Sequence, residues 1–230
     1  MKIGITERGD AALDLSWVKW VKDHKPAILI TKNPEKLYEI LASPELCVQN
    51  IIIHCTITGY GASILEPNVL PWQRSIQAVY DLYSQFGPNR IVLRVDPIIP
   101  TDKGIDLAKK VMNVVDGLTI RKRISFIDNY DHVKERFKKA NISLPWDSFH
   151  APLDLRLKVW KELGEPEVCG EPGMKCTGCI SKLDCETLNV VPIEVDKGQR
   201  PYCACLMNKK ELLDSRRRCE HACLYCYWHD

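Results

Sequence analysis

Residues 51–58 read Ile-Ile-Ile-His-Cys-Thr-Ile-Thr, a short run that is largely apolar and rich in β-branched side chains. Such a run predicts a strand covered on both faces, as strands are in parallel α/β sheets. An amphipathic helix is predicted downstream of it, over Trp72–Phe86. We therefore expect a strand–helix unit of an α/β protein at this point of the chain.

The same alternation continues on both sides of this unit. Further strands are predicted at Lys2–Thr6, Ala27–Thr31, Ile91–Val95 and Leu118–Phe126. Further helices are predicted at Leu15–Val21, Pro34–Leu41, Ile105–Val115, Asp131–Ala140 and Ser148–Leu163. Five such units fall short of a closed eight-stranded barrel. The predicted fold class is α/β, with a partial (β/α) barrel of parallel strands over residues 1–163.

After Gly164 the sequence is interrupted repeatedly by glycine, proline and cysteine residues. We expect one short strand there, at Val190–Val195, and one helix, at Asn208–Arg217. Large apolar side chains are too few for an independent core, so bound metal would supply the missing folding free energy. Residues 164–230 are therefore predicted to form a cysteine-rich, cluster-binding region.

The bulk composition excludes several classes of protein. A net charge of +2 and 45% hydrophobic residues indicate neither disorder nor a globally polyanion-binding chain. No apolar run is long enough for a membrane span, and the N-terminus lacks the features of a secretory signal. We expect a soluble protein of the cytoplasm.

The chain has 11 cysteines, and all but Cys47 and Cys55 fall between Cys169 and Cys226. In a secreted miniprotein this density would indicate disulfides. A long, cysteine-poor α/β region precedes these residues and no export signal is present, so metal ligation is the favoured use.

The last cysteines form a C-x3-C-x2-C motif, Cys219-Glu-His-Ala-Cys223-Leu-Tyr-Cys226. Three thiolates on one loop can ligate three irons of a 4Fe-4S cubane and leave the fourth iron open. An open iron can chelate the amino and carboxylate groups of S-adenosylmethionine. A zinc site, or a cluster completed by a fourth cysteine, is the alternative.

This spacing, with an aromatic residue before the last cysteine, resembles the signature of the radical S-adenosylmethionine (radical SAM) superfamily. That superfamily normally carries its triad after the first strand, so the order here is permuted. The chain is most similar to a branch with the triad at the C-terminus, and more distantly to spore photoproduct lyase. The resemblance rests on Thr31-Lys-Asn-Pro34, Thr58-Gly-Tyr-Gly61, Glu66-Pro-Asn68, Arg94-Val-Asp-Pro-Ile98, Ser125-Phe-Ile-Asp128 and the terminal Cys-Leu-Tyr-Cys-Tyr.

The resemblance implies that the strand ends face the cofactor. Tyr225 would contact the adenine, and Lys32 the methionyl carboxylate. Oxygen atoms of the first strand end would contact the methionyl amino group. The remaining strand ends would contact the ribose and carboxylate. The implied residues are Glu7, Arg8 and Asp10 at the first strand end, and Thr56, Thr58, Arg94 and Asp96 at the later ones.

Each of these assignments has a structural alternative. Arg94 and Asp96 are also suited to an internal ion pair, and Lys32 to a solvated loop position.

Six further cysteines are candidate ligands of at least one auxiliary 4Fe-4S cluster. A zinc site is the main competitor, because tetrahedral zinc accepts any four thiolates. The branch with the C-terminal triad aligns with Cys169, Cys179, Cys203 and Cys205, leaving Cys176 and Cys185 as departures.

The resemblance also implies hydrogen abstraction by a 5′-deoxyadenosyl radical, with electrons from an external donor such as a flavodoxin or ferredoxin. The expected substrate is a modified nucleobase in DNA or a modified nucleoside. Its reaction would be isomerisation of an amino-acid-modified thymine, as in bacteriophage hypermodification isomerases, or lyase-type repair. Arg216-Arg217-Arg218 would steer phosphate, and Tyr60, Cys55 and Tyr130 are candidate hydrogen donors. Radical modification of a peptide or small metabolite, and a non-catalytic zinc-stapled nucleic-acid-binding protein, are the alternatives.

Overall fold

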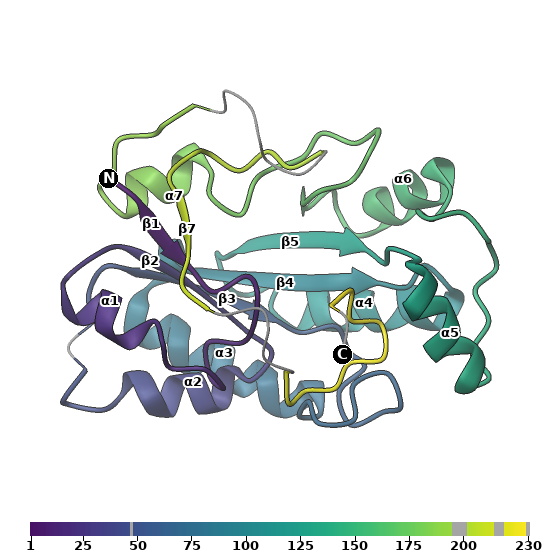
Figure 1. The fold of residues 1–230 in the computed structure, drawn as a ribbon, viewed down its shortest axis with the longest axis horizontal. Helices are drawn as coiled ribbons and strands as arrows, with labels where there is room; N and C mark the ends of the chain where they lie inside the picture. The colour runs from purple at the N-terminus through teal and green to yellow at the C-terminus, as the bar shows by residue number, and fades with distance from the viewer. Residues whose placement is uncertain (47, 195–201, 214–218, 229–230) are drawn as a thin grey trace.

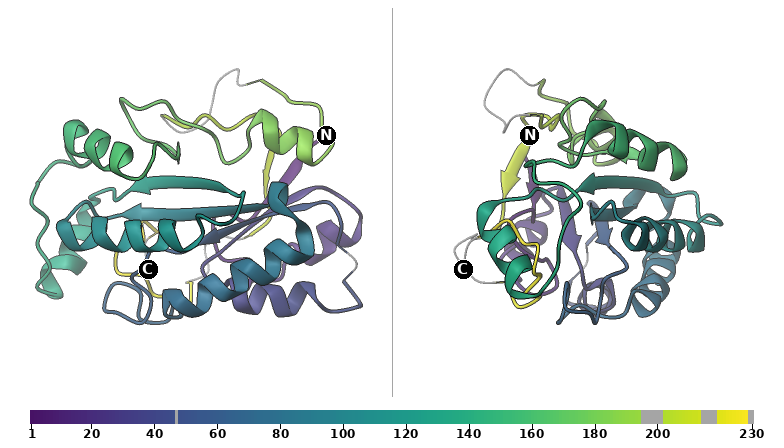
Figure 2. Two further views of the ribbon diagram at one scale, coloured as in Figure 1. Left: turned by 180° about the vertical axis from the view of Figure 1, so that it is seen from behind. Right: turned by 90° about the vertical axis from the view of Figure 1, so that its right-hand side faces the viewer.

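The computed structural model describes residues 1–46, 48–194, 202–213 and 219–228 (Figure 1). Its core is one seven-stranded sheet with the order β6-β5-β4-β3-β2-β1-β7, in which every neighbouring pair is parallel. The sheet curls into a half-barrel (Figure 2), which confirms the predicted fold class. The strands are β1 (Ile3–Ile5), β2 (Ala27–Thr31), β3 (Ile51–Thr56), β4 (Ile91–Ile98), β5 (Arg121–Phe126), β6 (Glu167–Val168) and β7 (Lys209–Glu211).

Helices cover one face of the sheet, and the cysteine-rich segment covers the other (Figure 1). Asn33 caps the helix at Pro34, since its side chain accepts a hydrogen bond from the backbone of Lys36. The helices are α1 (Val18–Lys22), α2 (Pro34–Leu41), α3 (Trp72–Phe86), the short 3-10 helix η1 (Pro88–Arg90), α4 (Asp102–Val114), α5 (Asp131–Lys139), α6 (Leu153–Glu162) and α7 (Lys182–Thr187). None of the helices described is long and apolar enough to cross a membrane.

Successive side chains of each strand alternate between the two faces. On β2, Leu29 packs into the core under the helices, whereas Ile28 and Ile30 face the opposite side. We call that opposite side the inner face of the half-barrel. Buried cysteines of the C-terminal segment pack on it, in contact with Ile3, Ile5, Ile28, Ile30, Ile52 and Val92.

Two elements predicted in the C-terminal segment are wrong within the described residues. No strand forms at residues 190–194. Where a helix was expected from Asn208, Lys209–Glu211 instead forms β7, which pairs in parallel with β1. An unpaired edge strand leaves backbone groups without partners, and tertiary pairing overrides local helix propensity at this edge. Residues 214–217 of that predicted helix lie outside the described residues.

Several predicted boundaries also move, and two of these shifts have a clear local cause. The helix expected from Ser148 begins only at Leu153, because Pro152 restrains the residue before it from helical geometry. The strand expected from Leu118 begins at Arg121, since residues 118–120 complete the turn after α4, where Leu118 N donates to Val115 O.

Candidate cofactor site at the carboxyl ends of the strands

A cavity of about 360 Å³ opens at the carboxyl ends of the parallel strands, the edge at which α/β folds place ligands. All three cysteines of the C-terminal motif, Cys219, Cys223 and Cys226, line it. Of the other residues predicted for the site, Glu7, Arg8, Asp10, Lys32, Thr56, Arg94, Asp96, Cys169 and Tyr225 line it as well.

Contacts from two distant segments hold the cysteine loop over the strand ends. Leu224 N donates to Leu65 O over 2.9 Å, and Asn68 Nδ2 donates to Glu220 O over 2.7 Å. From α5, Arg136 donates to the backbone oxygen of Cys226. These contacts bring the three cysteines to the strand ends.

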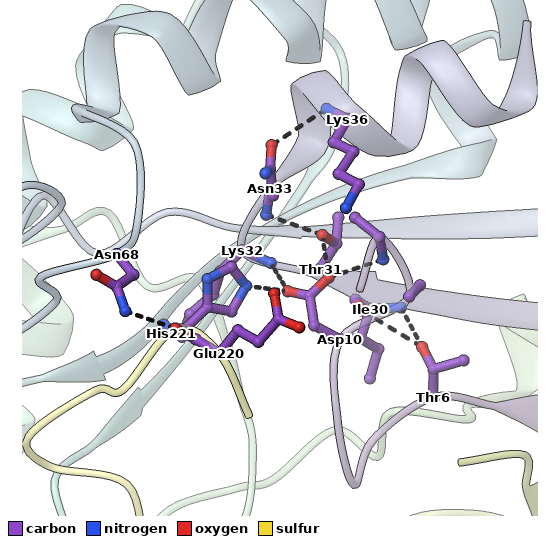
Figure 3. Close-up of polar contacts among 12 residues, drawn as sticks. Thr6, Asp10, Ile30, Thr31, Lys32, Asn33, Lys36, Asn68, Glu220 and His221 are labelled. Atoms are coloured by element: carbon purple, nitrogen blue, oxygen red, sulfur yellow. Dashed lines mark hydrogen bonds and ion pairs between the residues drawn. The ribbon is translucent and has the colours of Figure 1, made fainter. Parts of the chain in front are cut away.

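A buried contact between two polar side chains anchors the loop to the first strand end. His221 Nε2 lies 2.7 Å from Asp10 Oδ2. The Asp10 carboxylate also accepts hydrogen bonds from Thr31 Oγ1, at 2.7 Å, and from the backbone N of Lys32, at 2.6 Å (Figure 3). Burial raises the pKa of Asp10, but the hydrogen bond and charge of His221 and these donors lower it on balance. Asp10 is thus a structural anchor as well as a cavity-lining residue.

Lys32 occupies a buried, charged network rather than a solvated loop position. Its Nζ donates to Glu66 Oε1 and to Tyr225 Oη, each over 2.9 Å, and to the backbone oxygen of Asp96 at 3.3 Å. Tyr225 in turn donates to Glu66. Burial alone would lower the pKa of Lys32, but the Glu66 carboxylate raises it on balance, so the ammonium is retained.

Glu66 has a central place in this network, although no predicted cofactor contact includes it. It is 1% exposed. Burial raises its pKa, but Lys32 and the Tyr225 hydroxyl lower it on balance. The Glu66-Pro67-Asn68 segment was part of the resemblance, and a carboxylate followed by proline in a loop was the available signal.

Arg94 and Asp96 form the internal ion pair that was the structural alternative for them, and Ser125 donates to the same carboxylate. Burial raises the pKa of Asp96, but the Arg94 guanidinium outweighs it and lowers that pKa. Both residues still line the cavity. The carboxylate is therefore fixed in place at the cavity wall.

The remaining predicted contacts divide between cavity and core. Thr58 does not line the cavity and is buried, with its Oγ1 accepting a hydrogen bond from Tyr60 N at 3.2 Å. Glu7 forms an ion pair with Lys209 of β7. The guanidinium of Arg8 lies 5.9 Å from the centroid of the Trp228 ring, in cation–π contact. Thr58 is thus a turn-stabilising residue in this structure.

The motif thiols are suited to metal ligation rather than to free-thiol chemistry. Burial raises the pKa of Cys223 to about 12, although Lys32 acts in the opposite direction, and burial also raises the pKa of Cys219. Thiolates that burial disfavours to this extent form when a cation is bound. The three motif cysteines share one loop, with a cationic Lys32 close to Cys223, and this arrangement fits a cluster that carries net negative charge.

Five of the six other cysteines pack on the inner face, and Cys176 lies apart from them. Cys169, Cys179 and Cys205 are buried on the inner face, where Cys169 Sγ lies 3.6 Å from Cys179 Sγ. Cys203 packs at the edge of the same cluster. Cys176 lies apart, with its sulfur accepting a hydrogen bond from Glu171 N at 3.1 Å. Cys185 lies on α7 and is buried in the same inner-face cluster as Cys169, Cys179 and Cys205.

Comparison with known proteins identifies a family match. A family described as a domain of unknown function, DUF1848, matches residues 16–228. No curated protein and no solved structure matches the chain.

Proposed function

We propose that this chain, which belongs to the DUF1848 family, is a radical SAM enzyme. One observation carries the proposal: Cys219, Cys223 and Cys226 line the same strand-end cavity as Lys32 and the other predicted cofactor contacts except Thr58. The triad reaches this position from the opposite end of the chain, so its place is set by tertiary contacts and not by sequence order.

The three motif thiolates would hold a 4Fe-4S cluster. When bound, the cluster would supply an electron that cleaves S-adenosylmethionine and releases a 5′-deoxyadenosyl radical. Cys169 also lines the cavity, but its sulfur contacts Cys179 on the inner face. The fourth iron would accordingly stay open to the cofactor.

The cofactor's polar groups match the charges of the cavity. Lys32 would give up part of its hydrogen bonding to Glu66 and donate instead to the methionyl carboxylate. The carboxylates of Glu7 and Asp10 would attract the methionyl amino group, and Arg94 with Thr56 would contact carboxylate and ribose oxygens. Tyr225, between two ligand cysteines, is assigned to the adenine.

An aromatic group beside the cavity supports a planar substrate. Tyr227 and Trp228 line the cavity, and their ring centroids lie 5.0 Å apart. The ring centroid of Tyr130 lies 6.4 Å from that of Tyr227 and 4.8 Å from that of Phe149. Phe149 is 41% exposed. Aromatic faces with an arginine nearby, here Arg136, suit base stacking and phosphate. Our proposed substrate is a modified nucleobase in DNA, which the enzyme would isomerise or cleave. Arg216–Arg218, the residues predicted to steer phosphate, lie outside the described residues.

Anaerobic reconstitution tests the cofactor assignment. We expect a brown protein that forms 5′-deoxyadenosine when given dithionite, or a reduced flavodoxin or ferredoxin, together with S-adenosylmethionine. Cys223→Ala should abolish this product, and Cys176→Ser, a cysteine away from the cavity, should not. A colourless, zinc-loaded and inert protein would replace the proposal with a zinc-stapled nucleic-acid-binding role.

The substrate is tested separately, with the reconstituted enzyme and mass spectrometry of the products. Hypermodified DNA and its free nucleosides should give products that depend on S-adenosylmethionine. An isomerase would leave the mass of the nucleoside unchanged, and a lyase would change it. Turnover of peptides or small metabolites, with no change in any nucleoside, would contradict the nucleobase assignment and leave the cofactor chemistry intact.

A further inference from the structure

Four thiols on the inner face form a connected group apart from the C-terminal motif. Cys169 Sγ and Cys179 Sγ are 3.6 Å apart. The backbone N of Cys179 donates to Cys205 Sγ at 3.1 Å, and the Cys205 thiol is hydrogen-bonded to those of Cys179 and Cys203. The group joins residues 36 positions apart in the chain, from the end of β6 to the segment before β7.

The spacing of the sulfurs distinguishes between kinds of metal centre. Two thiolates bound at about 2.3 Å to one tetrahedral ion lie roughly 3.8 Å apart. Thiolates of a cubane bind different irons and are held further apart by the width of the cluster. The 3.6 Å separation of Cys169 and Cys179 therefore matches ligands of a single ion.

The charges around the group also match an anionic centre. Arg94 and Arg123 are register partners on β4 and β5, lie on the inner face, and interact electrostatically with Cys169 and Cys179. Among the described residues, Arg94 Nε and Arg123 Nη1 have no hydrogen-bond partner, and neither has either ring nitrogen of His54. Buried donors of this kind require an acceptor, and metal-bound sulfur provides one.

We infer that this face of the sheet holds a second metal centre, one tetrahedral ion bound by four thiolates. The ligands are Cys169, Cys179, Cys203 and Cys205. No three cysteine, histidine, aspartate or glutamate side chains of the described chain already surround one common point. Binding would therefore close the chain of sulfurs into a tetrahedron by rotation about Cα–Cβ bonds. Zinc and iron both take this geometry with four sulfurs.

The centre would fasten the cysteine-rich segment to the sheet. This segment contributes few large apolar side chains to the inner face besides Ile180, Leu188, Val190 and Leu206. Cys169 also borders the cofactor cavity, with Gly170 and Glu171 next to it. Loss of the ion would therefore loosen one wall of that cavity.

Metal analysis of a variant without the motif thiols tests this inference independently of the radical SAM proposal. In Cys219→Ala/Cys223→Ala/Cys226→Ala we expect one zinc or one iron per chain and no acid-labile sulfide. X-ray absorption at the metal edge should give four sulfur neighbours at about 2.3 Å. Four irons with sulfide, or a metal-free folded chain, would overturn the inference.

Single substitutions identify the ligands. Cys179→Ser in the same background should lose the metal, whereas Cys176→Ser and Cys185→Ala should keep one equivalent, because these two cysteines lie outside the group. If Cys179→Ser does not fold, native mass spectrometry of the wild-type chain still decides. The mass of one ion beyond any cluster at the motif supports the inference, and its absence overturns it.

Discussion

His221 Nε2 lies 2.7 Å from Oδ2 of Asp10, although the two residues are 211 positions apart in the chain. Both side chains are buried, at 3% and 4% exposure. The contact fixes the residues between Cys219 and Cys223 against the first strand end. The contact thereby holds the C-terminal cysteine loop against a residue that follows the first strand of the sheet.

Loss of the Asp10 charge should release the cysteine loop. For Asp10→Asn we expect about 2–3 kcal/mol lower free energy of unfolding, because a buried charge-assisted contact is lost. The reconstituted cluster should also be lost faster, as followed by its absorbance. Asp14→Asn is the matched control, since Asp14 accepts hydrogen bonds only from nearby Ser16 among the described contacts. Equal behaviour of the two variants would contradict the anchoring role.

Removal of the Lys32 ammonium should weaken cofactor binding. We expect Lys32→Met to raise the KM for S-adenosylmethionine by roughly tenfold to a hundredfold, because one charge-assisted hydrogen bond to the cofactor is lost. Lys36→Met, an exposed lysine on the adjacent helix, should leave the KM unchanged.

A stability effect of Lys32→Met is separated by a second variant. Lys32→Met leaves the buried Glu66 without its cation, so it should also destabilise the fold. Lys32→Met/Glu66→Gln should recover most of the stability but not the KM. Recovery of both would show that Lys32 has a structural role alone.

The Glu66 carboxyl should make stability depend on acid pH. Its folded-state pKa is lowered, because Lys32 and Tyr225 outweigh the effect of burial. The contribution is therefore fully present above the unfolded-state pKa and is lost as pH falls through the folded-state pKa. This is measured by urea unfolding of the variant Cys219→Ala/Cys223→Ala/Cys226→Ala, with and without Glu66→Gln. The difference in unfolding free energy between the two proteins should shrink below about pH 4.5. A difference that grows on acidification would contradict this sign.

Cys55 should play no part in hydrogen transfer. It is 0% exposed in the core under the helices, and burial raises the pKa of its thiol to about 12. Cys55→Ala should leave 5′-deoxyadenosine formation and substrate turnover unchanged, at a cost of about 1 kcal/mol in unfolding free energy. Iodoacetamide should not modify Cys55 in the native chain. Normal 5′-deoxyadenosine formation without product would instead implicate Cys55 as a donor.

Strands β1 to β4 were predictable because they are largely buried on both faces and read as apolar runs. Helices with strong periodicity or a proline start, such as Pro34–Leu41 and Trp72–Phe86, have the predicted bounds. The C-terminal segment was not predictable in this way. Lys209–Glu211 has no strand-like pattern and becomes a strand because β1 offers an unpaired edge.

The site was predictable in its residue types but not in its pairings. Spacing identified the cysteine motif, and the predicted strand ends identified seven cavity-lining residues: Glu7, Arg8, Asp10, Lys32, Thr56, Arg94 and Asp96. The contacts that set their charges join distant segments, as Lys32 does with Glu66 and Asp10 with His221. Such pairings depend on the tertiary fold, so no local sequence pattern predicts them.

Electron paramagnetic resonance of the reduced protein, before and after addition of S-adenosylmethionine, tests the central claim most directly. If the motif leaves one iron open to the cofactor, the cluster signal should shift in g-values on addition, and Cys223→Ala should show no such signal. A signal that is identical with and without S-adenosylmethionine would contradict the account.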